Sequence, residues 1–380
     1  MRLVVFTSGR QDWGALEGAG RALQVSPQLE VRVLAGGMHL RPGATPLEPP
    51  PDALAGGLPA GDDDQAVARA AGDTVRGVAE ALDSLRAEAL LLLGDRTETL
   101  AAALAATCLR IPIVHLHGGE TSTGAIDDAC RHAITRLAHL HCVAHASFRT
   151  RLLGWGEAPE RVVVSGAPAL DALLRATLPG RAELEEALGR PLGAPLVLLT
   201  HHPTSLGPDA PAAEVEAVLA GVRAGLGGVP DATVVCTRPN VDAGGAAIEA
   251  ALERHAQADP RLVLARDLGS LRWWGLMAQA QALVGNSSSG ILEAPCFDLP
   301  VVNVGPRQEG RLRIAPLFDV EARPEAVARA LVAALERPRA PGPPHPTAYG
   351  DGRAWERIRA ALERLAGLPP LERLRKLSGR

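Results

Sequence analysis

Short apolar runs alternate along the chain with longer stretches in which alanine and leucine recur at helical spacing. The runs have the length of buried strands, and the stretches between them have the period of helices. In the first half the apolar runs are residues 3–6, 31–34, 90–93, 113–116 and 162–164. The pattern restarts after residue 190, with runs at 196–199, 233–235, 262–265, 282–284 and 301–304. This alternation predicts an α/β fold of two Rossmann-like, doubly wound parallel sheets in tandem.

The domain junction is predicted from a helix and its termination signals. Residues 181–190 have helical spacing and end at Gly189, with Pro191 directly beyond. A chain of 380 residues also exceeds what one compact core usually holds. We therefore expect an N-terminal domain over residues 1–180 and a C-terminal domain over residues 190–350, with a cleft between them.

Two segments do not follow this alternation. Residues 351–380 contain charged and apolar residues at helical spacing, which predicts a C-terminal helix that packs back on the N-terminal domain. Residues 41–61 are rich in proline and glycine without an apolar period, which favours an irregular excursion over a strand or a helix. That excursion is either a lid over the cleft or an exposed insertion without a role.

Composition excludes several classes of protein. Apolar residues make up 47% of the chain and the formal net charge is −4, so neither nucleic-acid binding nor membrane binding is indicated. The five cysteines are odd in number and scattered among apolar residues, which favours reduced, buried thiols over a disulfide framework. The apolar run at the N-terminus is too short for a secretory signal. These observations predict a cytoplasmic protein.

Charged residues follow the predicted strands of the first half, at the carboxyl ends where doubly wound sheets bind ligands. Arg10 and Asp12 follow the first run, and Asp95 and Arg96 follow the third. Arg10 is either a cation directed into the cleft or a surface charge. Asp95 is either a site residue or the N-cap of the next helix, with Arg96 as its partner. No GxGxxG pattern accompanies them, so a dinucleotide cofactor is not expected.

The fourth run leads into a dense polar segment, HLHGGE at 115–120. Strand alternation places His115 and His117 on one face. The sequence has neither a CxxC pair nor an HExxH pattern, so we expect no metal site there. The next helix begins near Asp127, and Arg131 lies four residues on, where a surface ion pair is the simplest explanation.

The sharpest local signal is GNSSSGILE at 285–293, between a predicted strand and a predicted helix. Backbone N–H groups and serine hydroxyls at a helix N-terminus form an anion site, so we expect a diphosphate there. The alternative is a serine N-cap with Glu293 in the first helical turn, which requires only one serine. The segment matches neither the GxxxxGK[ST] nor the GxSxG pattern.

Other strand ends of the second half hold further candidates. His202 is one of two consecutive histidines after the first run, either of which could contact a phosphate. A turn-rich loop contains Asn240 and Asp242 and is either a ligand loop or a plain connector. Arg307 and Arg311 follow the last run and could add positive charge beside the diphosphate.

Seven motifs, taken in order, resemble the hydrolysing UDP-N-acetylglucosamine 2-epimerases of sialic-acid biosynthesis. They are SGR at 8–10, GDR at 94–96, HGGE at 117–120, GAIDD at 124–128, RHAIT at 131–135, GNSSSG at 285–290 and RQEGR at 307–311. The likeness covers nearly the whole chain, and the series is far more specific than any one motif. It implies the GT-B-like arrangement of two Rossmann domains that many glycosyltransferases share, with the nucleotide mostly on the second domain and the sugar in the cleft.

Carried over position by position, the resemblance implies two groups of site residues. The catalytic group is Asp95, His117, Glu120, Asp127 and Arg131. The nucleotide and substrate group is Arg10, Asp12, Arg96, His202, Asn240, Asp242, Leu268, Ser287, Ser288, Glu293, Arg307 and Arg311. Within it, Glu293 resembles the acceptor of the ribose hydroxyls. A glutamate often stands in the family where this chain has His117, so the assignment of acid and base stays open.

The resemblance implies a hydrolase that converts UDP-N-acetylglucosamine and water into N-acetylmannosamine and UDP. A base removes the C2 proton while the C1–O bond breaks, and water then adds to the 2-acetamidoglycal with inverted C2 configuration. No redox step occurs, so no cofactor and no metal ion are implied. The expected partners are a nucleotide-sugar substrate and further copies of the chain, as a dimer or a tetramer.

Other functions remain open on the same residues. One is the same reaction on a UDP- or GDP-linked 2,4-diacetamido-2,4,6-trideoxyglucose, in a legionaminic-type pathway. Another is a non-hydrolysing epimerase, although the HGGE and RQEGR motifs are more similar to the hydrolysing branch. A glycosyltransferase of this architecture would need an acceptor, and a nucleotide-sugar-binding regulator would not need Asp95 or Asp127.

Overall fold

The computed structural model describes residues 1–44, 46–61, 63–204, 206–207, 209–239, 243–265, 268–339 and 342–376, without the side chains of Arg10 and Gln11. The chain forms two compact units, which we describe separately. The first consists of Met1–Glu120, Asp127–Ala172 and Ala348–Arg380, and the second of Thr121–Ile126 and Leu173–Thr347. The short segment between Glu120 and Asp127 thus belongs by its contacts to the second unit.

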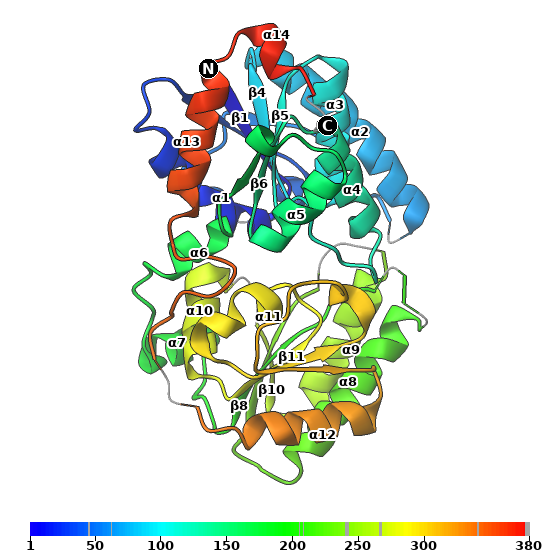
Figure 1. Ribbon diagram of the computed structural model, residues 1–380. Coiled ribbons are helices and arrows are strands. Elements are labelled where there is room, and N and C mark those ends of the chain that lie inside the picture. Colours follow the sequence, from blue (N-terminus) through cyan, green and yellow to red (C-terminus); the bar gives the residue numbers. More distant parts are fainter. Residues whose placement is uncertain are drawn as a thin grey trace. The chain divides into compact units, whose positions relative to one another are not determined.

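The first unit is built on a parallel seven-stranded sheet in the order β3-β2-β1-β4-β5-β6-β7 (Figure 1). Its strands are β1 (Arg2–Thr7), β2 (Glu30–Ala35), β3 (Ala53–Leu54), β4 (Ala89–Leu93), β5 (Ile113–Leu116), β6 (Leu140–Val143) and β7 (Val162–Val164). Its helices are α1 (Arg10–Leu23), α2 (Asp64–Ser84), α3 (Thr97–Cys108), α4 (Asp127–Leu137), α5 (Ala146–Gly154), α6 (Pro168–Leu173), α13 (Ala354–Ala366) and α14 (Pro370–Arg373), with 3-10 turns η1 (Gly37–Leu40) and η2 (Pro159–Arg161).

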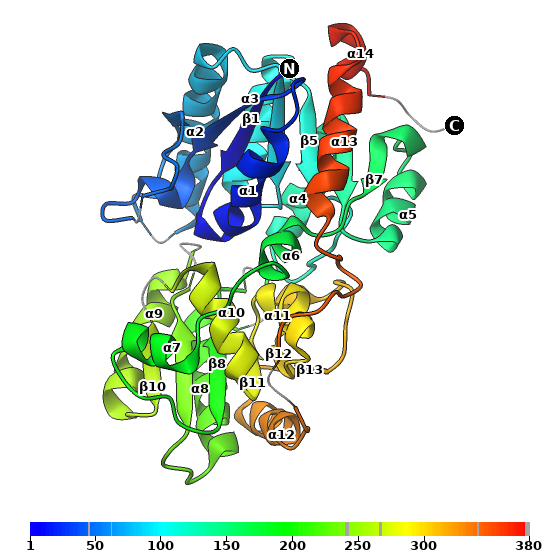
Figure 2. The same cartoon turned by 90° about the vertical axis from the view of Figure 1, so that its left-hand side faces the viewer.

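Helices cover both faces of this sheet, which is why its strands are apolar on both sides. Leu3 and Val5 of β1 point to one face and belong to one buried core with residues of α1 and with Trp355 of α13. Figure 2 shows α1 and α13 beside each other. Val4 and Phe6 point to the other face, where α2, α3 and the end of α4 lie. The C-terminal helix α13 therefore contributes to the core of the first unit although it follows the second in sequence.

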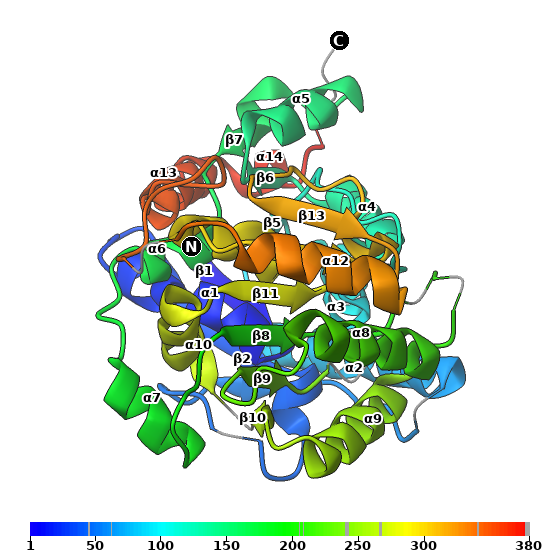
Figure 3. The same ribbon diagram turned by 90° about the horizontal axis from the view of Figure 1, so that it is seen from below.

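The second unit contains a six-stranded parallel sheet in the order β10-β9-β8-β11-β12-β13 (Figure 3). Its strands are β8 (Leu196–Thr200), β9 (Thr233–Thr237), β10 (Leu262–Ala265), β11 (Ala282–Gly285), β12 (Val301–Val304) and β13 (Leu317–Val320). Its helices are α7 (Arg181–Leu188), α8 (Pro211–Leu226), α9 (Gly245–Ala258), α10 (Gly269–Gln279), α11 (Ser289–Leu292) and α12 (Pro324–Leu335), with 3-10 turns η3 (Ala294–Phe297) and η4 (Pro306–Gln308).

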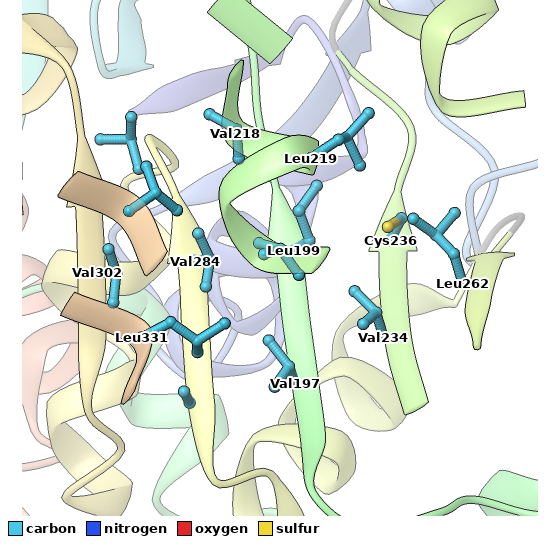
Figure 4. Close-up of a cluster of buried hydrophobic side chains, with 14 of the residues drawn as sticks. Val197, Leu199, Val218, Leu219, Val234, Cys236, Leu262, Val284, Val302 and Leu331 are labelled. Carbon is cyan, nitrogen blue, oxygen red and sulfur yellow. The ribbon is translucent and has the colours of Figure 1, made fainter. Parts of the chain in front are cut away.

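One buried core joins this sheet to α8, α9 and α12. Figure 4 shows Leu199, Val284 and Val302 side by side on adjacent strands, with Val218 of α8 and Leu331 of α12 near them. Burial of such side chains contributes about 1.5–3 kcal/mol each. This core holds the strands together and so positions the loops that follow their ends.

The ten predicted strands are all present, and the prediction of two doubly wound α/β sheets is confirmed. The expectation that residues 41–61 lack regular structure is wrong in one place, because β3 pairs with the end of β2 there. Strands β6 and β13 were not predicted. Gly189 ends α7 in the left-handed conformation, at φ 68°, as the sequence indicates.

Two further sequence expectations concern accessibility. Four of the cysteines are buried, but Cys108 is exposed at the end of α3, so the prediction of buried thiols is wrong there. Among the residues that the structure describes, no helix is both long and apolar enough to cross a membrane.

Candidate active site

The catalytic candidates of the first unit follow two adjacent strands. β4 and β5 pair in parallel, so the chain that follows each begins at the same edge of the sheet. After β4 the chain turns at Gly94, whose φ of 82° favours glycine, and presents Asp95. After β5 it presents His117. Asp95 and His117 therefore follow the ends of two neighbouring strands at the same edge of the sheet.

Asp95 forms an ion pair with Arg131, whose side chain is 1% exposed. The alternative that Asp95 caps the next helix is wrong, because Arg96 occupies the N-cap and makes no side-chain cap bond. The expectation that Arg131 takes part in a surface ion pair is also wrong, because the guanidinium is buried. Removing one partner of a buried pair typically costs about 3–5 kcal/mol. Arg131 thus fixes the carboxylate of Asp95 from helix α4.

His117 forms a close pair with Glu120. His117 Nδ1 and Glu120 Oε1 lie 2.5 Å apart, and the carboxylate is fully buried. β5 ends at Leu116 and His117 adopts a φ of 64°, so strand alternation does not extend to it and the prediction of a shared face with His115 is wrong. A buried carboxylate beside an imidazole can pass a proton between them.

His115 makes structural contacts to the turn after β4 and to α4. Its Nε2 lies 2.8 Å from the carbonyl oxygen of Gly94 and its Nδ1 lies 3.2 Å from Thr135 Oγ1. Burial lowers the pKa of His115 to about 3, so the ring stays neutral at physiological pH. His115 therefore ties β5 and α4 to the turn that carries Asp95, a role that the sequence did not reveal.

Asp12 lies in the first turn of α1, after β1, and Arg96 is the N-cap residue of α3, after β4. Asp12 Oδ2 accepts hydrogen bonds from the backbone N–H of Ser8 (2.9 Å) and from its hydroxyl (2.6 Å). Burial raises the pKa of Asp12, and the charge of Arg96 and the bonds from Ser8 oppose that rise. Arg96 itself pairs with Glu98 at 3.3 Å. Arg10 begins α1, but its side chain lies outside the described residues.

Asn286 organises the candidate diphosphate site of the second unit. It follows β11 and is completely buried. Its side-chain oxygen accepts from the His202 N–H at 2.8 Å, and its amide nitrogen donates to the His202 carbonyl at 2.8 Å. Its own carbonyl accepts from Arg307 Nη1 (3.2 Å) and Gln308 Nε2 (2.9 Å). One residue thus joins three loops that carry predicted ligand contacts.

The serines follow Asn286 at the start of α11. Ser288 is the N-cap and makes no side-chain cap bond, while Ser287 Oγ accepts from the Ser289 hydroxyl at 3.2 Å. α11 is only four residues long, so backbone N–H groups and hydroxyls, more than a helix dipole, would attract an anion here. Ser287 Oγ also accepts from the backbone N–H of Ser289 at 3.4 Å, so one serine bonds to the start of the helix.

Glu293 lies at the C-terminal end of α11, so the alternative that placed it in the first turn of the helix is wrong. Withdrawal of the carboxyl from water raises the pKa of Glu293 to about 7, and Trp274 opposes that rise. A carboxyl with this pKa changes charge close to physiological pH.

The remaining nucleotide candidates fall into two groups. Arg311 follows η4 in the same loop as Arg307, and Leu268 is the N-cap residue of α10. Asn240 and Asp242 lie outside the described residues.

A model of the UDP-N-acetylglucosamine 2-epimerase family matches residues 21–363 of the chain. The chain belongs to the UDP-N-acetylglucosamine 2-epimerase family. This confirms the family to which the motif series pointed.

Two relatives in this 2-epimerase family are similar over most of the chain. A UDP-N,N'-diacetylbacillosamine 2-epimerase (hydrolyzing) of Legionella pneumophila is 33% identical over 371 residues, which is 96% of each chain. A GDP/UDP-N,N'-diacetylbacillosamine 2-epimerase (hydrolyzing) of Campylobacter jejuni is 33% identical over 84% of each chain. A solved UDP-GlcNAc 2-epimerase of Methanocaldococcus jannaschii, in complex with UDP-GlcNAc and UDP, has the same fold, with a TM-score of 0.76, 15% identity, and coverage of 96% of this chain and 100% of that one.

Several residues of this candidate site were missed from the sequence. Asn286 was seen only as part of a small-residue run, and Gln308 as part of the arginine motif. Glu214 is buried on α8 and accepts from the Thr204 hydroxyl at 3.1 Å. A buried glutamate on an otherwise apolar helix face was the one signal for it.

Proposed function

We propose that the protein is a hydrolysing 2-epimerase that releases free 2,4-diacetamido-2,4,6-trideoxymannose from a nucleoside-diphosphate-linked 2,4-diacetamido-2,4,6-trideoxyglucose. The observation that carries this proposal is the 33% identity, over 96% of both chains, to the L. pneumophila enzyme named for UDP-N,N'-diacetylbacillosamine. UDP is the proposed nucleotide. GDP is the alternative nucleotide, because the name of the C. jejuni relative includes both GDP and UDP.

The residues of the first unit are proposed to move protons. One carboxylate takes the C2 proton as the C1–O bond breaks, which leaves the 2-acetamidoglycal and the nucleoside diphosphate. Water then adds its hydroxyl to C1 while C2 is protonated from the opposite face. Asp95, Asp127 and the His117–Glu120 pair supply these groups, and Arg131 holds Asp95 in place. A carboxylate shielded from water can approach the neutral pKa that suits this work.

The residues of the second unit are proposed to bind the leaving nucleotide. Ser287, Ser288 and Arg307 would hold the diphosphate, because hydroxyl donors and an arginine stabilise the charge that develops as the C1–O bond breaks. His202 would contact the same group, and Glu293 would accept the ribose hydroxyls. Diphosphate contacts from Arg10, Arg96 and Arg311, and contacts to the base and ribose from Asn240 and Leu268, remain predictions. For Asp12 and Asp242 the prediction is only that they belong to the nucleotide and substrate group.

UDP-N-acetylglucosamine is the second candidate substrate. The description of the matching family model favours it, as does the resemblance of the motif series to the enzymes of sialic-acid biosynthesis. The two substrates differ at C4 and C6, where one carries hydroxyls and the other an acetamido and a methyl group. A non-hydrolysing reaction on either sugar is the remaining alternative.

The test is the ratio of kcat/KM for UDP-N,N'-diacetylbacillosamine, its GDP analogue and UDP-N-acetylglucosamine, followed by release of free sugar and nucleotide. We expect the UDP-linked diacetamido sugar to be preferred by at least about 100-fold, since an unsatisfied polar contact costs about 1–3 kcal/mol and two positions differ. A higher kcat/KM for UDP-N-acetylglucosamine would contradict the proposed substrate but would still support hydrolytic 2-epimerisation as the reaction.

A further inference from the structure

We infer that residues 121–126, called the strap below, couple occupation of the diphosphate site to the positions of the catalytic carboxylates, with Thr121 and Gly124 as positioning residues. The inference rests on the proposed function. It concerns a segment whose contacts lie in the second unit although both of its ends continue into the first.

The strap is bonded to the loop that carries Arg307. Thr121 Oγ1 donates to the carbonyl of Gly310 at 2.7 Å, and the N–H of Thr123 donates to the carbonyl of Glu309 at 3.2 Å. The Thr123 hydroxyl also reaches Glu309 Oε2 at 3.3 Å. These bonds join Thr121 and Thr123 of the strap to the adjacent residues Gly310 and Glu309 of the loop, so a displacement of the loop would displace the strap as well.

The fit at Gly124 is tight. A Cβ at Gly124 would lie 2.5 Å from the carbonyl carbon and oxygen of Pro306, a distance that real side chains do not reach. The Gly124 carbonyl also accepts from the N–H of Leu206 at 3.2 Å. Only glycine permits this approach of two backbones, so the position of Pro306 and Arg307 sets the position of the strap.

The same loop is connected to the serines. Arg307 and Gln308 both donate to the carbonyl of Asn286, which shares its peptide plane with the N–H of Ser287. In a trans peptide the C=O and N–H point in opposite directions, so these two donors orient the Ser287 N–H. A diphosphate that binds Ser287 and Arg307 therefore fixes both sides of this junction.

The two ends of the strap lead directly to catalytic candidates. Glu120 precedes Thr121, and Asp127 follows Ile126 as the first residue of α4. The same helix carries Arg131, the partner of Asp95. Glu120 is held in turn by His117. A shift of the strap thus reaches each proposed carboxylate through covalent bonds and one buried ion pair.

The variant Thr121→Val tests this coupling, because it removes one hydroxyl bond while keeping the shape of the side chain. We expect kcat to fall about tenfold, with the Kd for UDP unchanged within about twofold, and Thr121→Ser to restore kcat. The matched control is Thr107→Val, because Thr107 also donates its hydroxyl to a backbone carbonyl, that of Ala103 at 2.8 Å, but inside α3.

Amide hydrogen exchange of the intact protein with and without UDP supplies a readout that does not depend on turnover. In the natural protein UDP should slow exchange both in residues 286–293 and in residues 121–131. In Thr121→Val the first effect should persist and the second should be lost. Protection of 286–293 without any change at 121–131 in the natural protein would overturn the coupling alone. No protection of 286–293 would overturn the proposed diphosphate site and the coupling with it.

Discussion

Asp127 and Asp128 are adjacent carboxylates in the first turn of α4 and provide a matched pair for testing the proposed chemistry. Asp128 pairs with His132 at 3.2 Å on the same helix, whereas Asp127 is the proposed acid or base. We expect Asp127→Asn to lower kcat by about 100-fold or more, the usual contribution of a general acid or base. Asp128→Asn should keep most of the activity.

UDP affinity, measured by calorimetry, is the accompanying readout for Asp127. It should stay within about twofold in both variants, because the diphosphate is assigned to residues of the second unit. A large loss of UDP binding in Asp127→Asn, or equal turnover in the two variants, would contradict the role given to Asp127.

Because the pKa of Glu293 lies near 7, we expect nucleotide binding to depend on pH. Its pKa of about 7 means that about one tenth of the carboxyl is ionised at pH 6 and about nine tenths at pH 8. Because a carboxylate accepts hydroxyl bonds better than a carboxylic acid, UDP should bind more tightly as pH rises through 7. The rise from pH 6 to pH 8 should be up to about ninefold larger in the natural protein than in Glu293→Gln, measured by calorimetry. Equal pH slopes would remove Glu293 from the nucleotide site.

Glu293 also makes the stability of the folded protein depend on pH, in the opposite direction to UDP binding: stability falls as pH rises. Its folded-state pKa lies above the ordinary value of 4.5, so the folded protein holds more protons between those two pH values. Stability from this group is therefore full below about pH 4.5 and is lost as pH rises through 7. Relative to the natural protein, Glu293→Gln should be more resistant to urea at pH 8 than at pH 5.

At the scale of elements, the end of β11 is where the sheet and the ligand loop meet. Gly285 has a φ of 135°, and a Cβ there would lie 1.8 Å from the carbonyl oxygen of Thr200 in β8. Gly285→Ala should therefore separate β11 from β8 and destabilise the protein by more than about 3 kcal/mol. Gly189→Ala is the control, because Gly189 also has a positive φ, 68°, but among the described residues its Cβ position meets nothing within 4 Å apart from the adjoining backbone.

Urea denaturation of the two glycine variants measures this difference. Gly189→Ala should cost only about 1 kcal/mol, the strain of the left-handed conformation. Equal losses for the two variants would show that backbone strain, and not the close approach of the strands, sets the cost at Gly285.

Strands were predictable from the sequence where all their residues are apolar. Strands with continuous apolar runs were all found, but β6 contains His141, which is buried against Glu157 at 3.1 Å. β13 contains Asp319, which accepts from the Asn303 amide at 2.6 Å. Such polar residues break the apolar run, and the partners that satisfy them lie too far along the chain to be seen in a local pattern.

At the scale of the whole chain, the sequence predicted which strand ends carry polar groups, but not how those groups pair. Asp95 and Arg131 are separated by two elements, and the Asn286 contacts join three loops. The strap is the clearest case, because nothing in its composition indicates that residues 121–126 belong to the second unit. Local spacing identifies candidates, whereas their partners follow from tertiary contacts.

Proton NMR of the protein with UDP-N,N'-diacetylbacillosamine in D2O tests the proposed hydrolytic epimerisation directly. We expect free UDP and a free 2,4-diacetamido-2,4,6-trideoxymannose that carries one deuterium at C2, because that carbon loses its proton and regains one from solvent. A 2-epimer that remains attached to UDP would contradict the hydrolytic reaction. A free sugar that retains its original C2 proton and configuration would contradict epimerisation itself.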